Sequence, residues 1–164
     1  MLNLKRSLRQ LDMTQASQDP ELQQRIRRDL RFLFERYGAI ITSNTRQPYG
    51  NSQISLAAGN VEFQFDKNER DGECRVLVAP REGYGVWEIA QVALSASIGE
   101  DGKALAFRLS YSDDPVSLSY VGLTELTFLL ESRFDRLNEA FTYDNYPATR
   151  LRMAEVEREL HRRR

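Results

Sequence analysis

Histidine and cysteine are almost missing from this sequence, which contains one of each. His161 stands in the arginine-rich run 161–164, and Cys74 stands in a pattern typical of a β-strand. These two residue types perform much of the nucleophilic, acid–base and soft-metal chemistry of proteins. Their scarcity argues against mechanisms that depend on cysteine and histidine, and against zinc sites built from them. It leaves carboxylate chemistry open.

Long apolar runs and an excess of one charge are also lacking. No run approaches the roughly 20 apolar residues that cross a bilayer, and polar residues follow Lys5 and Arg6 where a signal peptide would have an apolar stretch. The 23 basic and 24 acidic side chains leave a net charge of −1, so generic nucleic-acid binding is not indicated. Cys74 has no cysteine partner within the chain. We therefore expect a cytoplasmic protein without a membrane span or a specific nucleic-acid partner.

The apolar content is sufficient for one ordinary domain. Hydrophobic residues make up 41% of the 164 residues, and aromatic residues are spread along the chain, which excludes global disorder. Residues 1–18 are polar and weakly patterned, so we interpret them as an N-terminal arm. Residues 19–164 contain no linker or internal repeat, and we assign them to a single domain.

Three long segments have the spacing of amphipathic helices. Asp19 and Pro20 form a strong helix start, and Gly38 is a suitable stop, so we expect a helix over about 19–37. A second apolar stripe runs from Leu123 to Phe141. Pro147 fits the first position of a last helix, and a shorter helical pattern covers 86–94.

Between the first two long helices the period changes from helical to alternating. Val61, Phe63 and Phe65 alternate with polar residues, and similar runs bounded by turn residues extend from about 39 to 79. This pattern predicts a four-stranded antiparallel meander with one buried face. Residues 104–111 predict a fifth strand, with a helix as the alternative. The fold class is therefore α+β: a meander of four to five strands with an N-terminal helix, a middle helix and two C-terminal helices packed on it.

Two loops carry candidate binding residues. The loop with Arg81, Tyr84 and Trp87 could anchor a protein interface, because aromatic residues and arginine are enriched there. It could also be a plain strand-to-helix connector, since it lacks the glycine pattern of a nucleotide loop. Tyr49 and Asn51 form a second polar loop, which an ordinary turn also explains.

Acidic residues near the sheet are the other candidate. Glu62, Asp66, Glu69 and Asp71 could support hydrolysis or hold a hard cation if they met in one pocket. Alternatively, these acids simply belong to a solvent-exposed face of the sheet. The spacing of an EF-hand is not present. We assign no cofactor, no metal and no catalytic residue.

Four short stretches resemble a known group of proteins. They are Phe34–Gly38, Tyr49–Ser52, Val76–Arg81 with Trp87 following, and Phe141–Leu151. Together they resemble small bacterial α+β proteins, some of which are similar to immunity proteins of polymorphic toxin systems. The resemblance covers most of residues 19–160. It implies a cytoplasmic protein that neutralises a toxin by binding it, and it carries over no catalytic residue.

These observations favour a non-enzymatic protein that binds a protein partner in the manner of an immunity protein. The order of elements is also similar to that of secretion chaperones, which often form homodimers. The opposing hypothesis is a hydrolase that uses carboxylates such as Glu62, Asp66 or Asp71. The residues proposed to contact a partner are Arg81, Tyr84, Trp87, Tyr49 and Asn51.

Overall fold

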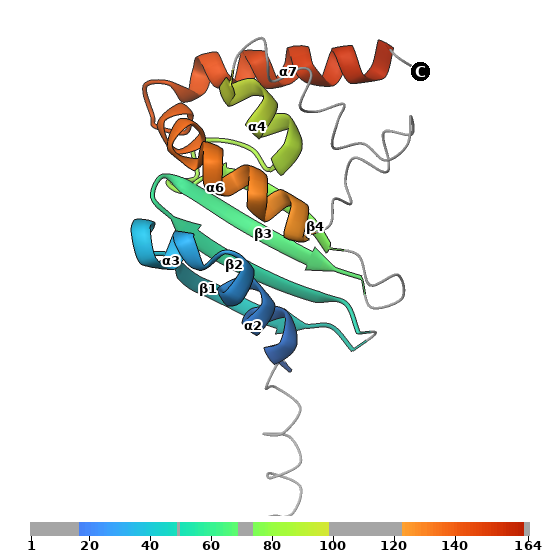
Figure 1. Cartoon of the computed structure of the whole chain (residues 1–164). Helices are drawn as coiled ribbons and strands as arrows, with labels where there is room; N and C mark the ends of the chain where they lie inside the picture. Colours follow the sequence, from blue (N-terminus) through green and yellow to red (C-terminus); the bar gives the residue numbers. More distant parts are fainter. Residues whose placement is uncertain (1–16, 49, 69–73, 99–122, 163–164) are drawn as a thin grey trace, which may run out of the picture.

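An antiparallel five-stranded sheet forms the centre of the molecule (Figure 1). The computed structural model describes residues 17–48, 50–68, 74–98 and 123–162. The strands follow one another in sequence order and are β1 (Ile40–Arg46), β2 (Ser52–Ala58), β3 (Val61–Lys67), β4 (Cys74–Pro80) and β5 (Glu88–Ile89). The four-stranded meander and the α+β class predicted from the alternation are confirmed.

The two faces of the sheet differ as the alternation requires. Ile54 pairs with Phe65, and Phe65 pairs with Val76, so these apolar side chains share one face. They are almost completely buried. On the other face Gln53, Asp66 and Arg75 form the matching cross-strand row. The register thus places a polar cross-strand row on one face of the sheet and a buried apolar row on the opposite face.

Two short helices precede the sheet, where the sequence predicted one helix over 19–37. Helix α2 (Pro20–Asp29) begins at Asp19, whose carboxylate accepts the Leu22 N–H at 2.9 Å. Helix α3 (Arg31–Tyr37) ends at Gly38 in the left-handed conformation, φ 62°. Leu30 breaks the run with φ −105° and ψ 28°. The prediction of one continuous helix is therefore wrong at Leu30. The sequence does not reveal the break, because the apolar stripe continues across it.

Helix α6 (Leu123–Ala140) lies with α2 on the apolar face of the sheet (Figure 1). Its Phe134 contacts Phe32, Tyr37 and Phe63 with ring centroids 4.4–6.1 Å apart. The aromatic cluster therefore joins the N-terminal helices, the sheet and α6 in one core.

Helix α4 (Ala90–Ile98) is enclosed between α6, the sheet and the last helix, α7 (Tyr146–Arg162) (Figure 1). Residues 90–96 are all buried, and the two polar ones are Gln91 and Ser95, whose hydroxyl donates to the Gln91 carbonyl. The predicted helix over 86–94 begins four residues late, because Glu88 and Ile89 pair with Val78 and Leu77 as strand β5. The strand predicted over 104–111 lies outside the described residues.

Within the described ranges, no helix combines the length and the apolar character needed to cross a bilayer.

Candidate interaction surface and polar pocket

An exposed aromatic surface forms where the β4–β5 loop meets the turn between α6 and α7. We define it as Tyr84, Val86, Trp87 and Tyr143. The exposed fractions are 46% for Val86, 43% for Trp87 and 71% for Tyr143. The rings of Tyr84 and Tyr143 meet edge to face with centroids 5.3 Å apart. Two exposed apolar side chains thus follow Tyr84 in the loop, and Tyr143 packs against Tyr84 itself.

The loop is held firmly on the α6–α7 turn. The Tyr84 hydroxyl donates to the carbonyl of Phe141, and the Val86 N–H donates to the hydroxyl of Tyr146 at 3.1 Å. Gly85 packs closely against Pro80 and the buried Tyr146: a Cβ at this position would lie 2.5 Å from atoms of both residues. Because the backbone is fixed from both sides, the exposed side chains project from a preorganised base.

The electrostatics of the loop are simple. Burial raises the pKa of the Tyr84 phenol, with a further contribution from Glu82, so the hydroxyl stays protonated and can donate its hydrogen bond. Arg81 is exposed, and its guanidinium donates to the Gly59 carbonyl at 3.4 Å. The Arg81 guanidinium therefore lies at the β2–β3 turn.

The predicted contact residues fall into two regions. Arg81, Tyr84 and Trp87 belong to the same loop, as the sequence suggested. Asn51 precedes β2 at the opposite end of the sheet from Arg81, about 20 Å away for a strand of this length. Tyr49 lies outside the described residues.

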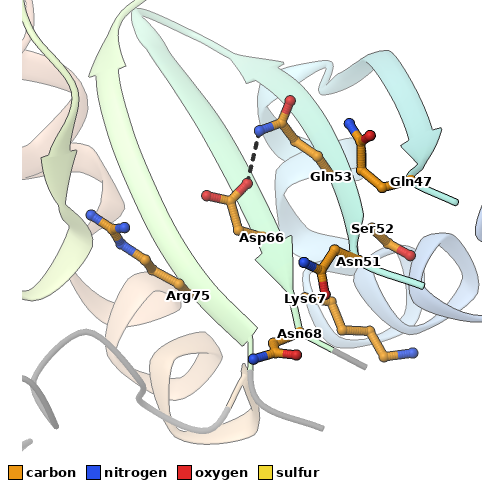
Figure 2. Close-up of a pocket in the computed structure, with 8 residues that line it drawn as sticks. All are labelled: Gln47, Asn51, Ser52, Gln53, Asp66, Lys67, Asn68 and Arg75. Carbon is orange, nitrogen blue, oxygen red and sulfur yellow. Dashed lines mark hydrogen bonds between the residues drawn. The ribbon is translucent and has the colours of Figure 1, made fainter. Parts of the chain in front are cut away.

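Asn51 instead lines a polar pocket of about 300 Å³ (Figure 2). Amide and charged side chains surround it: Gln47, Asn51, Ser52, Gln53, Asp66, Lys67, Asn68 and Arg75. Gln53 donates to the Asp66 carboxylate at 2.9 Å, and Gln64 donates to it at 3.1 Å. In Figure 2 the Arg75 side chain extends away from Asp66. The carboxylate is therefore held by amides and not by the arginine.

The acids singled out in the sequence do not meet in this pocket. Glu62 and Asp66 share one face of β3 but lie four residues apart, about 13 Å along the strand. Paired carboxylates of glycosidases lie roughly 5–9.5 Å apart. Glu69 and Asp71 lie outside the described residues. In the part of the chain that the structure describes, no group of three histidine, cysteine or acidic side chains could hold a metal ion.

A different pair of acids does meet, between β5 and α7. The carboxyl of Glu88 accepts the Ile89 N–H at 2.8 Å, and the Glu157 carboxyl lies close enough to it to raise its pKa. Burial, together with the neighbouring Glu157, raises the pKa of Glu88 to about 7. Spacing did not reveal this pair, because the two residues are far apart in sequence and Glu88 belonged to a predicted helix. Tyr143 was missed because it lies in a turn, and only the fold brings it against Tyr84.

The lone cysteine is structural. Cys74 is buried on the apolar face, and burial raises the pKa of its thiol to about 12. The thiolate that would be needed for nucleophilic chemistry is therefore absent near neutral pH. His161 is exposed on α7, where Glu157, Arg158 and Arg162 line the same shallow cavity.

No family model, curated protein or solved structure matches this chain.

Proposed function

We propose that this protein is a non-enzymatic binding protein whose partner is another protein. The observation that carries the proposal is the aromatic surface of Tyr84, Val86, Trp87 and Tyr143 on its fixed base. Tryptophan, tyrosine and arginine supply most binding hot spots in protein interfaces. Arg81, in the same loop as Tyr84 and Trp87, adds the third of these residue types.

Rigidity supports the same proposal. Hydrogen bonds to Tyr146 and Phe141 fix the loop, so it loses little conformational entropy when a partner binds. Less of the binding free energy from contacts of Trp87 and Tyr143 is therefore offset by ordering the loop. An enzyme would need convergent reactive groups, and the acids singled out on β3 are four residues apart.

The finer form of the proposal is an immunity-like role in a bacterial cytoplasm, with a toxin as the partner. The short stretches 34–38, 49–52, 76–81 and 141–151 motivate it. Co-expression with the cognate toxin is expected to restore growth, and a chain altered at the aromatic surface is expected to restore it poorly.

The first test is capture of partners from the native host with three immobilised proteins: the wild type, a Trp87→Ala/Tyr143→Ala double variant and a Phe128→Ala variant. Phe128 is a matched control because it is 79% exposed on α6 and does not belong to the aromatic surface. We expect the same partner on the wild type and Phe128→Ala, and its loss from the double variant.

The partner is then purified, and its affinity is measured by calorimetry. Truncation of an aromatic hot spot costs about 2 kcal/mol or more, so the double variant should bind at least about 30-fold more weakly. Equal affinity of all three proteins for the purified partner would exclude the aromatic surface as the binding site.

A further inference from the structure

A second cavity, open to solvent, lies where α4, α6 and α7 meet, and most of the side chains that line it are exposed. Its volume is about 420 Å³, which is within the range of small-molecule sites. Arg136 and Glu139 reach it from α6, Arg152 from α7, Ser97 from α4 and Asn145 from the turn. Ala140 and Ala148 form the small side chains of its walls.

The two arginines in this cavity have few partners among the residues that the structure describes. Among the described residues, neither Arg136 nor Arg152 forms an ion pair with a carboxylate. Arg152 donates a long hydrogen bond, 3.4 Å, to the Thr149 hydroxyl. Two guanidinium groups from different helices thus remain available for carboxylate groups, which they bind in a bidentate manner.

The remaining polar groups of the cavity are mainly acceptors. Ser97 uses its proton on the Leu94 carbonyl at 2.9 Å, which leaves the lone pairs of the hydroxyl oxygen. Asn145 donates its amide to the Glu139 carbonyl at 3.0 Å, which leaves its own amide oxygen to accept. With the carboxylate of Glu139, these groups match an ammonium ion, which has three donors and no acceptor.

From this complementarity we infer that the cavity binds a free acidic amino acid, with its two carboxylates on Arg136 and Arg152 and its ammonium group toward Glu139. The charges match one to one: two cations and one anion line the cavity, and two anions and one cation make up the ligand. This inference does not depend on the proposed protein partner, because the ligand and the residues differ.

Calorimetric titration with L-glutamate tests the inference, with glutarate and γ-aminobutyrate as matched probes. Glutarate keeps both carboxylates and lacks the ammonium group, whereas γ-aminobutyrate keeps one carboxylate and the ammonium. We expect glutamate to bind more tightly than either. Arg136→Gln and Arg152→Gln should each weaken glutamate binding about 10- to 100-fold, the usual effect of removing a charged hydrogen bond.

Two further variants distinguish binding in the cavity from non-specific attraction of glutamate to surface cations. Glu139→Gln should abolish the preference for glutamate over glutarate. Arg150→Gln, which removes an exposed α7 cation that does not line the cavity, should bind glutamate like the wild type. Circular dichroism establishes that each variant is folded. The absence of saturable glutamate binding to the wild type would overturn the inference, as would equal binding of glutamate and glutarate.

Discussion

At the scale of single residues, Asp19 connects the first helix to the sheet. Its buried carboxylate accepts the Leu22 N–H at the start of α2 and the Ser52 hydroxyl of β2 at 2.6 Å. The ammonium group of Lys67 on β3 lies 3.6 Å away. Burial opposes the negative charge, but these partners together hold the pKa of Asp19 below its ordinary value.

Replacement of Asp19 by Asn should therefore destabilise the protein. The substitution weakens a helix cap and a charged hydrogen bond, so the free energy of unfolding should fall by about 1–3 kcal/mol. Urea unfolding at neutral pH measures this loss. Because the pKa is lowered in the folded state, the contribution of Asp19 is present above the ordinary aspartate pKa and is lost as the pH falls below it.

Asp144→Asn is the matched control, since Asp144 is exposed in the α6–α7 turn. An unchanged unfolding midpoint for Asp19→Asn would contradict the role of this carboxylate.

At the scale of elements, the long regular segments were predictable from the sequence. The alternation of Val61, Phe63 and Phe65 marks a strand with one buried face, and that face is buried in the structure. Asp19 and Pro20 marked the start of α2 correctly. Capping residues and period-2 patterns succeed because the causes of the structure lie within a few neighbouring residues.

The irregular elements were not predictable for a physical reason. Strand β5 has two residues, Glu88 and Ile89, and so has no period; only its pairing with β4 makes it a strand. The break at Leu30 is likewise hidden, since Leu30 is itself fully buried and fits the apolar stripe of a continuous helix. Both features are set by tertiary contacts rather than by local preference.

The β4–β5 loop gives a prediction at the element scale. Gly85→Ala places a methyl group against Pro80 and Tyr146, so the loop must shift away from the α6–α7 turn. Overpacking of this kind costs about 1–3 kcal/mol. We expect a lower unfolding midpoint in urea, and Trp87 fluorescence in the folded state that differs from that of the wild type.

Gly83→Ala separates this clash from a general effect of alanine in the loop. Gly83 has a left-handed φ of 72° but nothing within 4 Å of an added Cβ, so alanine there meets backbone strain and no clash. Wild-type fluorescence of the folded Gly85→Ala protein would argue against the proposed fit.

At the scale of the whole molecule, a carboxyl group of the sheet and one of α7 influence each other. Glu157 of α7 lies close enough to Glu88 of β5 to raise its pKa, and Arg75 of β4 contributes a weaker opposing charge. The folded protein therefore retains a proton on Glu88 up to a pH near 7, whereas an unfolded chain releases it near pH 4.5.

The sign of the resulting pH dependence follows from this difference. The folded state binds more protons between about pH 4.5 and 7, so the contribution of Glu88 to stability declines as the pH rises through that window and is constant above it. Glu88→Gln should flatten this decline when the free energy of unfolding is measured in urea at several pH values. Glu62→Gln is the control, and an unaltered slope in Glu88→Gln would refute the assignment.

The candidate surface was only partly predictable at this scale. The sequence singled out Arg81, Tyr84 and Trp87, since an aromatic loop between elements is visible in one segment. It gave no indication that Tyr143 lies against Tyr84, because only the fold brings these rings together. The Arg136–Arg152 cavity was missed for the same reason, since each of its walls comes from a different helix.

The contacts that fix the β4–β5 loop also determine when during synthesis the aromatic surface can form. They join Tyr84 to Phe141 and Val86 to Tyr146, which are 57 and 60 positions apart. The hairpins of β1 to β4 need only neighbouring segments and can close while the ribosome is still translating. The aromatic surface must wait until the start of α7 has emerged, so a nascent chain that stops before Tyr146 would carry a sheet without this binding face.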